Sequence, residues 1–204
     1  MKKILIPIAA LIALMLIAVG CETSSSAAKL DEAPGGYTTV THEGITLRFS
    51  YLDGKDLLAL YNNRNNPFIE YKSGRLMVIE TAIQSDTSLQ LGLENAQLST
   101  PGGDRGPVSK ETLHDYWYNL LKKKYEGYGK GGGQYSNWTM KIVMETIDKT
   151  VLASDAQALA GTETVGYILF DQVRGEKKVN ATLTLPVYDS QGELLHEFEF
   201  SFPI

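Results

Sequence analysis

The run VNATLTLPVYDSQGELLHEFEFSF, residues 179–202, decides the fold class. Both halves are rich in β-branched and aromatic residues, and the intervening DSQG segment (189–192) has the composition of a hairpin turn. Alternate residues of the second half fall on one face, namely Leu194, His196, Phe198, Phe200 and Phe202. The pattern predicts an antiparallel hairpin with one face in a core and the other mostly in solvent.

Further short runs toward the N-terminus also have the composition of β-strands. Residues 46–51 alternate polar and apolar side chains with a period of two, and residues 164–173 are β-branched and aromatic. Residues 75–84 and 88–98 flank a possible turn at 85–87. We expect these two runs to form consecutive antiparallel strands.

A helical pattern interrupts the strands. In residues 109–125, apolar side chains recur at helical spacing at Leu113, Trp117, Leu120 and Leu121, and Ser109 can serve as the N-cap. Residues 137–149 predict a second helix, although 141–147 could also form a strand. Residues 127–134 contain five glycines and are expected to be a flexible link between the helices.

Seven or eight short strands around this insertion predict a mainly β fold, an antiparallel, immunoglobulin-like β-sandwich. We expect a single domain over residues 37–204, with the helical insertion at about 109–149.

The N-terminus has the layout of an export signal. Lys2 and Lys3 precede an apolar stretch at 4–19, which is short for a membrane span. Residues 18–21 (AVGC) are similar to the lipobox of bacterial lipoproteins, and Cys21 is the sole cysteine, so no disulfide can form within the chain. The sequence predicts cleavage after residue 20 and a flexible tether over 21–36; the alternative is an ordinary secretory signal with an incidental cysteine.

Charge and motifs narrow the function classes. Removal of residues 1–20 changes the net charge from −5 to −7, which disfavours nucleic acid as a partner. The G-x-G-x-x-G pattern at 127–132 follows a predicted helix instead of a strand, and so does not predict a dinucleotide site. No G-x-S-x-G motif is present. We expect no catalytic residue, metal site or cofactor, and hence no enzyme.

Histidines and carboxylates fit ordinary structural roles. His42, His114 and His196 each precede an acidic residue, yet they belong to three distant predicted elements without metal-ligand spacing. The carboxylate pairs Asp53 with Asp56 and Asp189 with Glu193 sit beside glycines, which favours turns.

Aromatic side chains with polar tips concentrate in and near the insertion. They include Tyr116, Trp117, Tyr128, Tyr135 and Trp138, which we predict as possible partner-binding residues. The alternative is that these side chains pack the helices onto the sandwich.

With its lipobox, its NPF segment (66–68) and its GYILF run (166–170), the chain resembles uncharacterised bacterial lipoproteins with an immunoglobulin-like accessory domain. The resemblance implies a β-sandwich attached to the cell envelope by acyl chains (palmitate or similar) on Cys21. Glu22 favours the outer membrane where the source has two.

Three functions follow as hypotheses. The first is a non-enzymatic lipoprotein that binds another envelope protein or assists assembly. The second is a solute- or glycan-binding lipoprotein with a pocket under the aromatic insertion. The third is an envelope hydrolase with a dispersed site.

Overall fold

The computed structural model describes residues 37–61, 66–69, 76–125, 129–172 and 179–204, with the backbone alone at 125 and 129–137. The strands are β1 (Thr38–His42), β2 (Ile45–Leu52), β3 (Leu76–Ser85), β4 (Leu89–Leu91), β5 (Gln97–Thr100), β6 (Gly103–Arg105), β7 (Gln157–Ala158), β8 (Thr164–Asp171), β9 (Asn180–Tyr188) and β10 (Leu194–Pro203). The helices are α2 (Gly54–Leu60), the 3-10 turn η1 (Leu93–Asn95), α3 (Lys110–Tyr125) and α4 (Gly129–Thr150).

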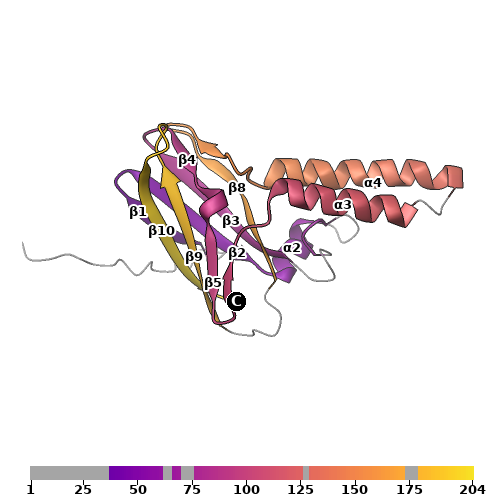
Figure 1. Cartoon of the computed structure of the whole chain (residues 1–204), viewed down its shortest axis with the longest axis horizontal. Helices are drawn as coiled ribbons and strands as arrows, with labels where there is room; N and C mark the ends of the chain where they lie inside the picture. Colours follow the sequence, from indigo (N-terminus) through magenta and orange to yellow (C-terminus); the bar gives the residue numbers. More distant parts are fainter. Residues whose placement is uncertain (1–36, 62–65, 70–75, 126–128, 173–178) are drawn as a thin grey trace, which may run out of the picture.

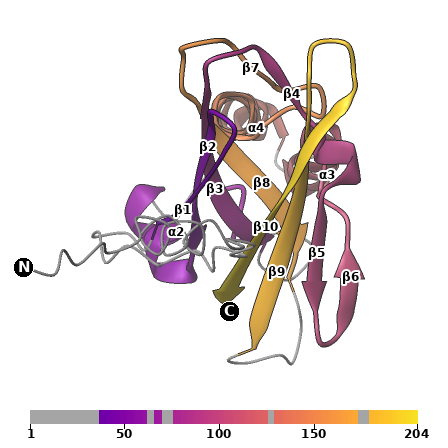
Figure 2. The ribbon, with the colours of Figure 1, turned by 90° about the vertical axis from the view of Figure 1, so that its left-hand side faces the viewer.

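The strands form two antiparallel sheets that lie face to face (Figures 1 and 2). One sheet has the order β1-β2-β3-β8, and the other has the order β6-β5-β9-β4-β7 with β10 also paired to β9. The predicted mainly β, antiparallel fold is confirmed at this level. The β9–β10 hairpin is also confirmed: Asp189 Oδ1 accepts hydrogen bonds from the backbone N–H groups of Gln191 (2.8 Å) and Glu193 (2.9 Å).

The core between the sheets is built by alternate residues of facing strands. Phe49 from β2 meets Phe200 from β10 with ring centroids 4.2 Å apart, and both are almost completely buried. Between Phe198 and Phe202, the intervening Glu199 and Ser201 are exposed, as the alternating pattern predicts.

A second core covers the outer face of the four-stranded sheet at one end. Leu52, Val78 and Leu169 from β2, β3 and β8 contact side chains from α2, α3, α4 and Phe68. Because β3 is buried on both faces here, its sequence is apolar almost without alternation. Among the described residues, the buried side chains of both cores lie between Ile45 and Phe202, and Val40 and Ile204 pack against the first core.

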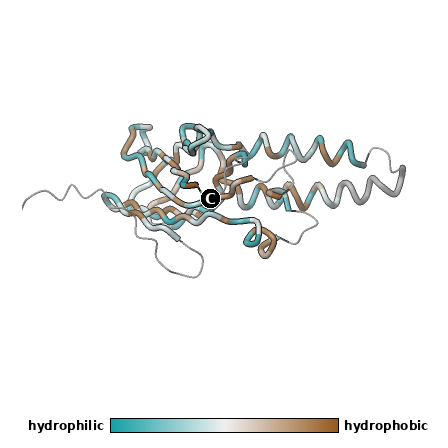
Figure 3. The backbone as a smooth tube through the Cα atoms, turned by 90° about the horizontal axis from the view of Figure 1, so that it is seen from below, coloured by the Kyte–Doolittle hydropathy of each residue, from teal (hydrophilic) through white to brown (hydrophobic). Residues whose placement is uncertain are grey.

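Helices α3 and α4 form an antiparallel pair, here called the helical hairpin, which projects beyond the sheets (Figure 1). Hydrophobic and hydrophilic residues alternate along both helices (Figure 3). Ser109 Oγ accepts the backbone N–H of Thr112 at 3.1 Å, which confirms the predicted N-cap of α3. The helix predicted over 137–149 is confirmed, and the strand alternative is wrong.

Three local predictions are wrong. Residues 88–98 do not form one strand, because η1 separates β4 from β5. Residues 85–87 do not form a hairpin turn, since β3 and β4 belong to different sheets. The predicted glycine-rich link is shorter than expected because α4 already begins at Gly129, so tertiary pairing with α3 outweighs the poor helix propensity of glycine.

Asp53 and Asp56 occupy a different setting from the predicted turn. Asp53 caps α2 and Asp56 completes a capping box, with Asp53 Oδ1 accepting the Asp56 N–H at 3.0 Å and Asp56 Oδ2 accepting the Asp53 N–H at 2.9 Å. The backbone N–H groups of Asp56 and Lys55 donate to the Asp53 carboxylate and hold its pKa below the usual range. The pair serves to start a helix.

Candidate functional site

The chain enters and leaves the helical hairpin beside the same strand, β8. The Val108 N–H donates to the Leu169 carbonyl at 2.7 Å, just before α3, and the Leu152 N–H donates to the Tyr167 carbonyl at 3.1 Å, just after α4. Both connections therefore run beside β8. This arrangement positions the two helices side by side at the edge of the four-stranded sheet.

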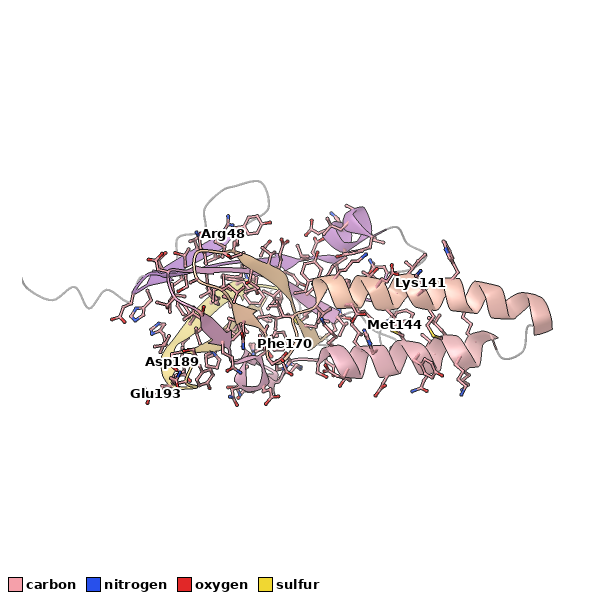
Figure 4. The ribbon with its side chains drawn as sticks, turned by 90° about the horizontal axis from the view of Figure 1, so that it is seen from above. Arg48, Lys141, Met144, Phe170, Asp189 and Glu193 are labelled. Carbon is pink, nitrogen blue, oxygen red and sulfur yellow. The ribbon has the colours of Figure 1, made fainter. Side chains whose placement is uncertain are left out.

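Polar contacts join the two helices near their base. Lys110 Nζ donates to the Asp148 carbonyl at 3.1 Å, and His114 Nε2 lies 3.1 Å from Asp148 Oδ1, at ion-pair distance when the imidazole is protonated. Met144 lies between the helices and Lys141 on the outer side of α4 (Figure 4). Asp189 and Glu193, which are labelled in the same view, lie at the opposite end of the molecule.

Two of the predicted binding residues are packing residues. Trp117 is only 5% exposed, and its indole Nε1 donates to the Pro67 carbonyl at 3.0 Å. Tyr116 packs edge-on against Trp117 with ring centroids 5.8 Å apart. Asn66 holds the same loop by donating to the Leu57 carbonyl and accepting the Phe68 N–H, both at 3.0 Å. The NPF segment thus anchors the hairpin base.

Another predicted residue is open to solvent. Trp138 is 59% exposed on α4, and Tyr118 on α3 is 50% exposed. Lys122 Nζ lies 6.0 Å from the centroid of the Tyr118 ring, at the limit of a cation–π contact. Tyr128 and the Tyr135 side chain lie outside the described part of the chain. Exposed aromatic rings of this kind are typical of contact surfaces.

A cavity of about 300 Å³ lies at the base of the hairpin. Its walls come from η1, the two connections to the hairpin and β8, with Val108, Leu152 and Leu169 among the apolar residues and Glu94, Ser109 and Ser154 among the polar ones. Neither Trp117 nor Trp138 lines it, contrary to the pocket imagined for the solute-binding hypothesis.

Tyr167 lines this cavity and carries a perturbed hydroxyl. It accepts a hydrogen bond from the Tyr61 hydroxyl at 3.0 Å. Burial raises the pKa of Tyr167 above its usual range, so the phenol is neutral at physiological pH. The cavity is therefore an apolar space with uncharged hydroxyls near it and one carboxylate, that of Glu94.

Two histidines that the sequence placed in unrelated elements meet at the edge of the sandwich. The rings of His42 in β1 and His196 in β10 stack with centroids 3.8 Å apart, and Phe198 packs edge-on against both. Burial lowers the pKa of His196, with a further contribution from His42. Arg48 forms an ion pair with Glu163. Within the described ranges, no group of three or more His, Cys, Asp or Glu residues is arranged to hold a metal ion.

The export signal, Cys21 and the tether lie outside the described residues, so their assignment stays a prediction. None of the described helices combines the length and apolar character needed to span a membrane. Comparison with protein-family models, with curated proteins and with solved structures finds no match to this chain.

Proposed function

We propose that this protein is an exported lipoprotein, anchored to the cell envelope through Cys21, whose immunoglobulin-like sandwich is a non-enzymatic binding module. The helical hairpin is its contact arm. The observation that carries the proposal is the hairpin itself, which projects beyond the sheets and presents exposed Trp138 and Tyr118 away from both cores. The lipobox at 18–21 supports the anchor.

The build of the hairpin supports a presenting role. Its base is fixed by the Trp117–Pro67 hydrogen bond and by the second core, which extends along the helices as far as buried Leu121 and half-buried Met140. Side chains on such a rigid support need little ordering when a partner binds, which favours affinity. The outer membrane is the proposed site where the source has two membranes.

Site-specific crosslinking in cells tests this proposal. A photoreactive amino acid at position 138 should form a crosslink to another envelope component, whereas the same probe at exposed Glu199 on the sandwich should not. A Cys21→Ser variant should be released from the membrane fraction by a high-salt wash and lose the crosslink. Equal crosslinking at both positions, or none at either, would refute the contact arm.

Point variants are better than removal of the hairpin for this purpose. Deletion of residues 109–149 uncovers Leu52, Val78 and Leu169, because α3 and α4 cover the second core. The exposed apolar face would capture proteins nonspecifically. Substitutions in the outer part of the hairpin avoid this artefact.

The cavity favours a second candidate function, binding of a small, mostly apolar solute. Its volume of about 300 Å³ lies at the lower end of ligand pockets. A Leu152→Trp substitution would fill it, while Leu159→Trp, at an exposed position, is the control. Thermal stabilisation by a screened solute that is lost only in Leu152→Trp would establish this function.

A further inference from the structure

Charge is segregated along the helical hairpin. Its distal half is defined here by the residues whose side chains the structure describes, 118–124 and 138–141, which contain four lysines and no acidic residue: Lys122, Lys123, Lys124 and Lys141. These residues carry +4 while the whole chain carries −5, so the rest of the chain carries −9. The basal half, residues 110–117 and 142–150, has two lysines and four acids. The positive charge is thus concentrated at the projecting end of an acidic protein.

Helix capping accounts for only part of this pattern. Cations in the last turn of α3 interact favourably with the helix dipole, which explains Lys122 and its two neighbours. It does not explain Lys141, which lies in the middle of α4 and pairs with Glu145 at 3.7 Å with its side chain 73% exposed. Nor does it explain an exposed tryptophan on the same segment.

The exposed aromatic residues lie in the same part of the hairpin. Tyr118 is seven residues from the end of α3 and Trp138 nine residues from the start of α4, or about 10 and 14 Å along their axes. Trp138 lies about 140° and 180° around the helix from Val143 and Ile147, which are buried. Its ring therefore points away from α3 and into solvent.

We propose that the distal half of the hairpin docks on an anionic phospholipid surface. Lysines near such a surface are attracted by its negative potential, and tryptophan and tyrosine favour the boundary between headgroups and hydrocarbon. An acidic protein or an anionic polymer would match the lysines, but a bilayer also accommodates the apolar ring of Trp138. The inference rests on the proposed function, in which Cys21 already places the domain beside a membrane.

Reach does not prevent this contact. The predicted tether of 16 residues spans at most about 55 Å when extended, and α4 with 22 residues is about 33 Å long. The lipid on Cys21 and the distal half can therefore contact the same bilayer. A second attachment of this kind complements acyl anchoring, as basic patches do in other peripheral proteins.

Vesicle binding tests the proposal with a protein of residues 37–204, which contains every described residue of both cores. We expect binding to vesicles of phosphatidylglycerol and phosphatidylcholine, little binding to pure phosphatidylcholine, and weakening with added salt. The triple variant Lys122→Gln, Lys123→Gln, Lys124→Gln should bind on the order of a hundredfold more weakly, at roughly fivefold for each lysine near the surface.

A charge-matched control separates this site from net charge. The variant Lys55→Gln, Lys110→Gln, Lys149→Gln changes the net charge equally but lies outside the distal half, and it should bind nearly as tightly as the unsubstituted protein. Circular dichroism shows whether each variant is folded. Equal loss in both triple variants, or equal binding to both vesicle types, would overturn the proposal.

The two tryptophans provide an internal spectroscopic probe. On docking, the emission of exposed Trp138 should shift to the blue and become protected from acrylamide, whereas Trp138→Phe leaves only buried Trp117 and should show no shift. Polyphosphate and an acidic protein serve as competing probes. If these probes bind and vesicles do not, or if position 138 crosslinks only to a protein, the lipid inference is wrong but the proposed contact arm stands. If vesicles do not bind and no crosslink forms, both proposals are refuted.

Discussion

Replacement of Trp117 by phenylalanine should destabilise the protein by about 2–4 kcal/mol. The indole N–H donates to the Pro67 carbonyl at 3.0 Å in a buried setting, and phenylalanine would leave that carbonyl without this donor. An unsatisfied buried acceptor costs about 1–3 kcal/mol. The smaller ring also leaves roughly 40 Å³ of space, which at about 24 cal/mol per Å³ adds about 1 kcal/mol.

The same substitution at the other tryptophan is the control. Trp138 is 59% exposed and lies in neither core, so Trp138→Phe should change the free energy of unfolding by less than about 0.5 kcal/mol. Urea unfolding of residues 37–204, followed by far-ultraviolet circular dichroism, gives both values. The slope with urea should be the same in the two variants. Equal destabilisation by the two substitutions would refute the assignment of Trp117 as an anchor and Trp138 as a surface residue.

Three further outcomes are expected. Gly92→Ala should destabilise the fold by about 1–3 kcal/mol, because the new Cβ would come within 2.4 Å of the Tyr188 ring. Gly106→Ala should leave the stability unchanged, because no atom lies within 4 Å of the Cβ position there. Equal thermal denaturation midpoints for the two variants would contradict this prediction. The pKa of His196 is lowered in the fold, so the stability that its neutral form contributes is complete above about pH 6.5 and is lost as the pH falls through the folded-state pKa. His196→Phe should therefore reduce the loss of stability at low pH. An unchanged pH dependence of urea unfolding in this variant would argue against the prediction. Asp189→Ala removes two hydrogen bonds of the β9–β10 turn and should cost about 1–2 kcal/mol by the same measurement, while no change would mean that the turn forms without them.

Regular periodic segments were predictable from the sequence. Strand β10 and its hairpin with β9 follow from strict alternation and from the DSQG turn, and α3 follows from its apolar spacing and Ser109. In these segments, local propensity and burial agree. Alternation could not reveal that β3 is buried on both faces, because that depends on where the helical hairpin returns.

The candidate site was less accessible from the sequence. An aromatic-rich insertion was visible, but the sequence could not separate Trp117, which is bonded to a loop fifty residues earlier, from Trp138, which faces solvent. The stack of His42 on His196 joins two strands at opposite ends of the chain, and no local pattern encodes such a contact. The lysines of the distal half indicate a docking surface only when the structure shows that α3 and α4 project beyond the sheets.

Both ends of the helical hairpin are attached beside β8, so a small change of angle at its base becomes a large displacement at its far end. With α4 about 33 Å long, a tilt of about 10° at the base would move the far end by about 6 Å. The connections at its base also line the cavity, so a ligand bound there would contact the residues that set the direction of the hairpin. A distance label near residue 138, referenced to β10, would report a change in that direction.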